Sequence, residues 1–145
     1  MDIEATAFHE AGHAWAYRLR ELPLRYVTTR PRDGSLGICR PWKPRRIDPY
    51  DAMFTASAGP VAQAIWSQQM YPDDGYDWHD YLVGAVLCGG HDDLSKANGM
   101  LDSPSVMEWM RGEQQRHWPA ISALAQALIE RHTLSGRDAF SILAG

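Results

Sequence analysis

The stretch ATAFHEAGHAWAYRL, residues 5–19, decides how the rest of the chain is interpreted. Small and apolar residues recur in it at helical spacing and no proline interrupts it, so the pattern predicts a helix over residues 3–20. His9 and His13 are four residues apart, and residues at this spacing project from the same face of a helix. Glu10 directly follows the first histidine. The predicted helix therefore carries three polar groups with the spacing of a metal-binding motif.

Two imidazoles on one helix face can bind a single Zn²⁺ ion at about 2.0–2.1 Å. Glu10 lies roughly 100° round the helix from His9, where it cannot easily join the ion but can reach a water molecule on it. There Glu10 can act as general base, taking a proton from that water and passing it to a leaving amine. Chance produces such a pattern in roughly one chain of this length in a few hundred. We therefore favour a metal site over coincidence.

Spacing alone does not identify a third metal ligand. Hydrolytic zinc sites usually have three protein ligands and keep one position open for water. A third histidine six residues after His13 is excluded, because position 19 is a leucine. The remaining candidates by residue type are His79, His91, Asp92, Asp93, Glu108, Glu113, His117, Glu130 and His132.

Outside this helix, the sequence predicts a mainly α domain with a short β element in its N-terminal third. Residues 25–31 and 34–42 are rich in β-branched and aromatic residues around a turn-forming RDGS, which favours a hairpin or two neighbouring strands. Residues 47–70 favour a helix with an aspartate cap, kinked or interrupted at Gly59–Pro60.

The second half of the chain predicts further helices. Residues 71–80 have the composition of a loop, and residues 81–90 are apolar enough for a short helix or a buried strand. Helical patterns follow at residues 92–101, from Pro104, from Pro119 with an apolar face over 121–129, and from a capping Ser135 to Leu143.

Composition and charge restrict the class of protein. The 145 residues, interpreted as one domain over 1–145, are 45% hydrophobic and 22% charged, which is typical of a folded globular chain. The net charge of −4 gives no indication of a nucleic-acid partner. No apolar stretch approaches the roughly 20 residues of a transmembrane helix, and no P-loop motif for ATP occurs. Without a secretory signal, we expect Cys39 and Cys88 to be reduced thiols in a cytoplasmic protein.

Five segments, in order along the chain, resemble the FtsH peptidase family, the proteolytic domain of membrane-bound AAA+ proteases. The first segment is similar to the zinc-binding helix of the family. The second is similar to its strand segment and the third to its L-G-G-R-A-A-E-E helix. The fourth is similar to the G-A-S-N-D-I segment that brings its third ligand, and the fifth to its C-terminal helix pair. In this chain the five segments are FHEAGHA (8–14), VTTRPRDGSLGICRP (27–41), SAGPVAQAI (57–65), GGHDDLSKA (89–97) and ISALAQALIERHTLSGRDAFSIL (121–143).

The resemblance implies a ligand set and a catalytic base. His9 and His13 match the histidine ligands of the family, and Glu10 matches its catalytic glutamate. Asp93 matches the aspartate ligand, while the neighbouring Asp92 is the nearest rival and would more naturally cap a helix. The resemblance thus implies a His–His–Asp zinc site.

The resemblance also implies how a peptide would bind. In the family an edge strand near the zinc pairs with an extended substrate through main-chain hydrogen bonds. In this chain that strand would be residues 35–40, with Leu36, Gly37 and Ile38 flanking the cleft. Such binding depends little on side chains, so we expect broad specificity, or specificity set by another loop.

Three features depart from the family pattern. These 145 residues contain no counterpart of the AAA+ ATPase module or the membrane anchor, so we expect no ATP-driven unfolding of substrates within this chain. Gln63 stands where the family has a glutamate near the metal, which removes a charge from the surroundings of the ligands. The link over residues 67–88 is longer than in the family. Its loop could form a lid with Tyr76, Trp78 and His79 near the substrate, or be plain surface.

Together these observations predict an ATP-independent zinc metalloendopeptidase that acts on unfolded or flexible polypeptides. One alternative is a regulatory metalloprotease with a single partner protein as its substrate. Another is a zinc-binding interaction module without turnover. Family members form hexamers through their ATPase rings and protease domains, but without the ring a monomer or a dimer is equally expected.

Overall fold

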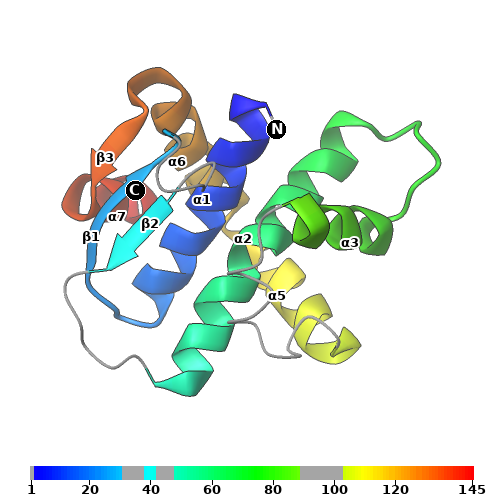
Figure 1. Ribbon diagram of the computed structural model, residues 1–145, viewed down its shortest axis with the longest axis horizontal. Helices are drawn as coiled ribbons and strands as arrows, with labels where there is room; N and C mark the ends of the chain where they lie inside the picture. The colour runs from blue at the N-terminus through cyan, green and yellow to red at the C-terminus, as the bar shows by residue number, and fades with distance from the viewer. Residues whose placement is uncertain (1, 31–37, 42–47, 89–102) are drawn as a thin grey trace.

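The computed structural model describes residues 2–30, 38–41, 48–88 and 103–145. The prediction of a mainly helical fold with a short β element is confirmed (Figure 1). The elements are, in chain order, α1 (Ile3–Leu19), β1 (Leu24–Thr28), β2 (Ile38–Pro41), α2 (Pro49–Met70), α3 (Trp78–Cys88), α5 (Pro104–Arg116), α6 (Trp118–Arg131), β3 (Thr133–Ser135) and α7 (Gly136–Ala144).

Helix α1 occupies the centre of the fold. It begins where Asp2 accepts a hydrogen bond from the backbone N–H of Ala5 at 2.8 Å, as an N-cap does. The helix lies between α2 on one side and the sheet with α6 and α7 on the other (Figure 1). Because neighbours surround it, residues from Ala5 to Tyr17 are buried on almost every face. The polar residues of α1 are therefore held in a dry, packed environment.

Helix α2 packs closely against α1 because small residues line the contact. A Cβ added to Gly12 would lie 2.5 Å from both the carbonyl oxygen of Ala58 and the Cβ of Ala62. Of the two alternatives at Gly59–Pro60, an interruption is not found, since α2 continues through both residues. An internal proline costs about 3 kcal/mol or more, but all residues over 54–66 are buried, and their packing holds the helix together.

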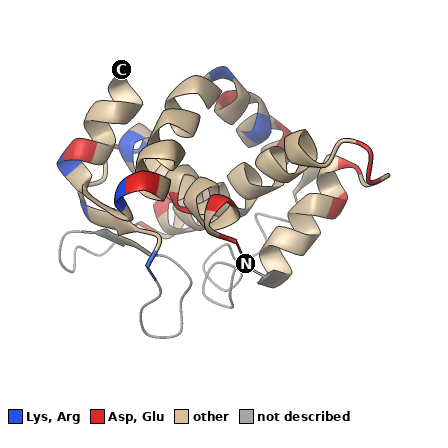
Figure 2. Ribbon diagram, turned by 90° about the horizontal axis from the view of Figure 1, so that it is seen from above, with Lys and Arg blue, Asp and Glu red and all other residues tan. Residues whose placement is uncertain are grey.

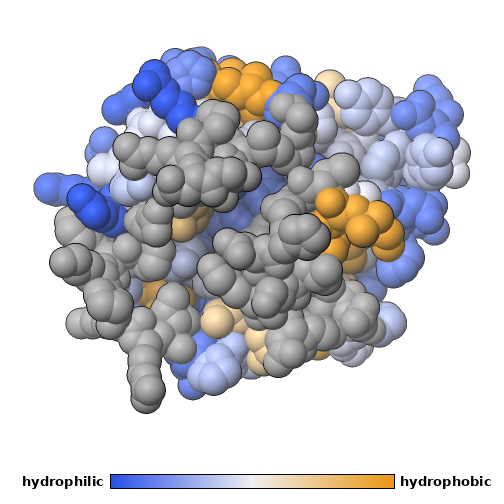
Figure 3. All heavy atoms as spheres, viewed as in Figure 1, coloured by the Kyte–Doolittle hydropathy of each residue, from blue (hydrophilic) through white to orange (hydrophobic). Residues whose placement is uncertain are grey.

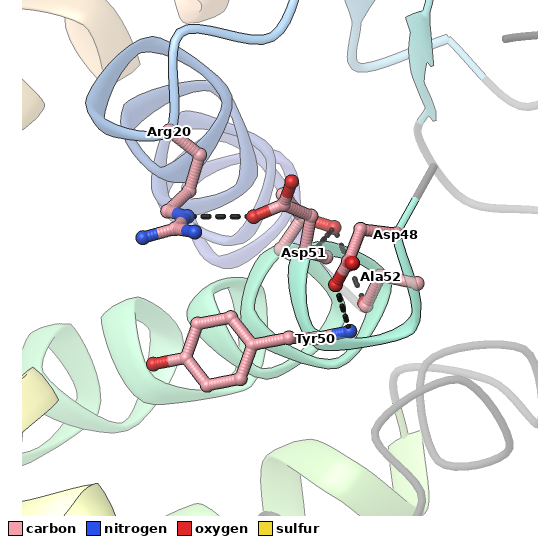
Figure 4. A network of polar contacts seen from close by, with 6 residues as sticks. Arg20, Asp48, Tyr50, Asp51 and Ala52 are labelled. Atoms are coloured by element: carbon pink, nitrogen blue, oxygen red, sulfur yellow. Dashed lines mark hydrogen bonds and ion pairs between the residues drawn. The ribbon is translucent and has the colours of Figure 1, made fainter. Parts of the chain in front are cut away.

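A polar clamp joins the C-terminal end of α1 to the N-terminal end of α2 (Figure 4). The Nε of Arg20 donates a hydrogen bond to Oδ1 of Asp51 at 2.6 Å, and the guanidinium lies over the Tyr50 ring, 5.1 Å from its centroid. This hydrogen bond raises the pKa of Arg20 above its ordinary value. Asp48 caps α2 by accepting from the N–H of Tyr50 at 2.8 Å, as predicted. The clamp holds the C-terminal end of α1 against the N-terminal end of α2.

The sheet has three antiparallel strands in the order β2-β1-β3. In the register, Val27 of β1 lies opposite Cys39 of β2 on one side and Leu134 of β3 on the other. The predicted pairing of the first two strands is confirmed, whereas β3 was not predicted. The turn expected between β1 and β2 lies outside the described residues.

The remaining helices complete the core. The segment that could be a helix or a strand forms α3. The predicted apolar face of α6 is buried, and its members are Ile121, Leu124, Ala125 and Leu128, with Ile129 half-buried. Ser135 accepts a hydrogen bond from the N–H of Asp138 at 3.1 Å and so caps α7. The helix predicted over 92–101 lies outside the described residues.

The surface carries charges of both signs. Acidic residues gather in the exposed loop between α2 and α3, where Asp73, Asp74 and Asp77 lie (Figure 2). Figure 3 shows an apolar patch over α3, where Val83 and Leu87 are exposed. Among the helices described, none combines the length and the apolar character that crossing a membrane requires.

Candidate metal centre

The two histidines of α1 lie one helical turn apart and face each other. Their Nε2 atoms are 3.1 Å apart, and their ring planes are inclined by 76° with centroids separated by 4.7 Å. Glu10 lies beside them, and one ligand atom from each of the three residues lies within 4.8 Å of the others. All three side chains are at least nine-tenths buried. The helix therefore brings together the group that the motif predicted.

Helix α2 provides a hydrogen-bond partner for each ring on the opposite side from Nε2. Nδ1 of His9 lies 2.8 Å from Oε1 of Gln63. Nδ1 of His13 donates to the backbone carbonyl oxygen of Thr55 at 2.6 Å. The structure thus places Gln63 against a predicted ligand, and it adds Thr55, which sequence reasoning did not identify.

Gly59 lies between these two partners on α2 and leaves space for a ring. A Cβ at this position would overlap the Nε2, Cε1 and Cδ2 atoms of His13. The sequence indicated only that small residues in this segment would permit close helix packing. The sequence could not show that Gly59 lies against the His13 ring, because this contact depends on which face of α2 packs against α1.

The geometry fits a metal ion such as Zn²⁺. Two nitrogens bound to one tetrahedral ion at roughly 2.0–2.1 Å lie about 3.3 Å apart, close to the 3.1 Å found between the Nε2 atoms of His9 and His13. Zinc-binding histidines usually donate their other N–H to a carbonyl or a carboxyl group, and Thr55 and Gln63 offer the oxygens for this. The donor set, the spacing and the outer hydrogen bonds all fit.

The third ligand is not found among the described candidates. Within the described ranges, the group of close ligand atoms consists of the three α1 residues already named. Six of the residues suggested by type lie elsewhere, on the second half of the chain: His79, Glu108, Glu113, His117, Glu130 and His132. His91, Asp92 and Asp93 lie outside the described residues. The assignment of Asp93, with Asp92 as its rival, stays a prediction.

Strand β2 approaches the same turn of α1. The thiol of Cys39 donates a hydrogen bond to the backbone carbonyl oxygen of Glu10 at 3.3 Å. Cys39 forms no disulfide with another described residue, and its side chain is half-buried. Of the strands described, only β1 pairs with β2, so the other edge of β2 has no strand partner among them. Ile38 begins β2 opposite Thr28.

Two other predicted elements of the site are only partly described. Leu36 and Gly37 lie outside the described residues, so their place beside a cleft stays a prediction. In the long link, Tyr76 is exposed, whereas Trp78 is buried in the hydrophobic core with the guanidinium of Arg111 5.0 Å from its ring. Trp78 therefore anchors α3 to the fold, and the role of the preceding loop as a lid stays a prediction.

Comparison of the sequence with known proteins does not identify a family for this chain. No model of a known protein family matches the chain, and no curated protein sequence matches it either.

Proposed function

We propose that the chain is a zinc metalloendopeptidase that hydrolyses peptide bonds in unfolded or flexible polypeptides without ATP. One observation carries the proposal: two imidazoles converge through Nε2 beside a buried glutamate, while helix α2 engages Nδ1 of each ring. A zinc ion bound there would supply Lewis acidity for the scissile carbonyl and would lower the pKa of a water molecule, so that loss of a proton turns that water into the nucleophile. We propose His9, His13 and Asp93 as its ligands.

Glu10 is the proposed general base. Its carboxylate lies within 4.8 Å of the ligand atoms of His9 and His13, so it can accept a proton from the attacking water. The same carboxyl group can then donate the proton to the leaving amine. The packing of α1 holds the carboxylate in place, since the residues next to Glu10 on the helix are buried.

An extended peptide is the proposed substrate because of the edge strand beside the site. The hydrogen bond from Cys39 to the Glu10 carbonyl places β2 against the turn that carries the base. A peptide that pairs with the outer edge of β2 would present its main chain near this turn. We propose that Leu36, Gly37 and Ile38 line this path, and that the enzyme works in the cytoplasm with neither nucleic acid nor ATP as a partner.

Hydrolysis of an unstructured protein tests the proposal. The zinc-loaded wild type should cleave casein, and Glu10→Gln should reduce the rate by about 10²–10⁴-fold because the base is lost. Zinc content should stay the same, since the glutamate is not a proposed ligand. Glu4→Gln, an exposed change on the same helix, should leave the rate unchanged.

Equal rates for wild type and Glu10→Gln would contradict the peptidase assignment. Zinc binding by a wild type that cleaves nothing would instead support an interaction module. Cleavage of one partner protein alone in a proteome-wide screen would support the regulatory protease.

A further inference from the structure

Three positions on one face of α2 match the two histidines of α1. Thr55, Gly59 and Gln63 are spaced four residues apart, so they follow one line along the helix. The first contacts the His13 ring through its carbonyl oxygen, the second leaves room for that ring, and the third contacts His9. Thr55 and Gly59 therefore serve the His13 ring, and Gln63 serves the His9 ring.

The chemistry of these contacts fixes where each ring carries its proton. A backbone carbonyl oxygen can only accept a hydrogen bond, so Nδ1 of His13 must be the donor to Thr55. The same holds for Nδ1 of His9 and the side-chain oxygen of Gln63. In a neutral ring with its proton on Nδ1, Nε2 accepts through its electron pair. Both electron pairs then converge on one point, since the two Nε2 atoms are 3.1 Å apart.

We propose that α2 sets the metal-binding state of both histidines before a metal arrives, with Thr55, Gly59 and Gln63 as positioning residues. This inference rests on the proposed metal centre and extends it to a second helix. The two groups that accept from Nδ1, the Thr55 carbonyl and the Gln63 amide oxygen, are neutral. Helix α2 therefore selects the tautomer of each ring without a carboxylate at Nδ1. Two electron pairs at this separation repel each other, and a cation between them removes the repulsion. The arrangement therefore favours a cation over a neutral ligand.

A purely structural role for the same residues makes different predictions. Close helix packing is already provided by Gly12, which contacts Ala58 and Ala62. The space at Gly59 is directed at the His13 ring rather than at the backbone of α1. If Gly59 and Gln63 only packed the helices, their replacement would change stability but not the chemical state of a particular imidazole nitrogen.

Metal affinity is the first readout, measured by competition of Co²⁺ and Zn²⁺ with a chelator. Gln63→Leu removes the acceptor and should weaken binding by about 10–100-fold. Gln63→Glu keeps an acceptor and should bind at least as tightly as wild type. Gly59→Ala should lose at least as much affinity as Gln63→Leu, because its methyl group displaces the His13 ring. Gly112→Ala is the matched control on α5, where a Cβ meets nothing within 4 Å, and it should bind as wild type.

The second readout is the position of the ring protons, measured by nitrogen NMR of the metal-free protein at about pH 8.5, where histidines with ordinary pKa values are neutral. Both rings of the wild type should carry hydrogen on Nδ1. Gln63→Leu should change the pattern of His9 while that of His13 is kept. This selectivity is what a general loss of packing would not produce.

Two results would overturn the inference: a wild-type His9 with its hydrogen on Nε2, or wild-type affinity in folded Gln63→Leu. Should Gly59→Ala fail to fold, the Gln63 variants and the ring protons still decide the matter. None of these measurements uses peptide cleavage, so failure of the proposed enzyme activity and failure of this inference are told apart.

Discussion

At the scale of single residues, each imidazole of the centre uses its two nitrogens for different tasks. Nδ1 bonds to α2, which holds the ring, and Nε2 faces the other histidine. Glu10 contributes in two ways as well, since its side chain lies by the rings and its backbone carbonyl accepts the Cys39 thiol. Each residue of the motif is thus connected both to the site and to a second element of the fold.

The Arg20–Asp51 clamp offers a prediction at this scale. Asp51→Asn removes the charge that pairs with Arg20 and should lower the free energy of unfolding by up to about 1 kcal/mol, because the pair is partly exposed. The loss should shrink as salt is added, since ions screen the pair. Urea unfolding at low and high salt measures it. Glu113→Gln, whose pair with Arg116 is 3.8 Å long, should show almost no effect, and an equal loss there would contradict the account.

The residues of the centre differ in how far the sequence could predict them. His9, Glu10 and His13 follow from local spacing, because one helix positions all three. Gln63 was singled out by the resemblance of its segment. Thr55 could not be found from residue type, because it acts through its backbone carbonyl, which every residue has.

At the scale of elements, the centre depends on the contact between α1 and α2. The two proposed histidine ligands lie on α1 and their outer partners on α2, so a shift between the helices would separate them. Aromatic rings support the same arrangement, because Phe8 stacks on Trp66 of α2 and on Trp118 of α6, with centroids 5.9 and 5.4 Å away. The chemistry of the centre is therefore coupled to helix packing.

Gly12→Ala tests this coupling. The added methyl group would lie 2.5 Å from the Ala58 carbonyl and the Ala62 Cβ, so the helices must move apart. We expect a loss of about 1–3 kcal/mol in the free energy of unfolding, as for overpacked cores, together with weaker zinc binding. Gly84→Ala on α3, where a Cβ has open space, should instead stabilise by about 0.5–1 kcal/mol. Unchanged stability and zinc affinity in Gly12→Ala would contradict the coupling.

Elements were predicted best where local signals were strong. The starts of α2, α5 and α6 carry prolines, and they begin where those prolines suggested. Strand β3 was missed because three residues give no period of their own, and its existence depends on pairing with β1. The sequence left a kink and an interruption of α2 open at Pro60, and local signals could not decide between them, because the continuity of the helix depends on burial that compensates for the lost hydrogen bond.

At the scale of the whole molecule, α1 packs against α2, α6, α7 and the sheet, while α3 and α5 pack against α2. The sheet and α6 support α1 from one side and α2 from the other, and the core runs continuously between them (Figure 1). A ligand bound to α1 and held through α2 should therefore stabilise the entire fold, because unfolding would release it.

Removal of zinc tests this global coupling. At free zinc about 100 times its Kd, binding adds about 2.7 kcal/mol to the free energy of unfolding, and each kcal/mol corresponds to roughly 2–4 °C in Tm for a chain near this size. A chelator should lower the Tm of the wild type accordingly. His79→Ala, on the exposed face of α3, should respond like wild type, whereas His9→Ala should show no response. A chelator response kept in His9→Ala would contradict the account.

Zinc-edge X-ray absorption of the protein with one equivalent of zinc tests the central claim most directly, because it counts the ligands and identifies their atoms. We expect nitrogen and oxygen neighbours at about 2.0–2.1 Å, with the outer-shell signal of two imidazoles that falls to one in His9→Ala. Sulfur neighbours at about 2.3 Å would mean that cysteine thiolates hold the metal. That result, or a spectrum unchanged in His9→Ala, would contradict the assignment of the centre to His9 and His13.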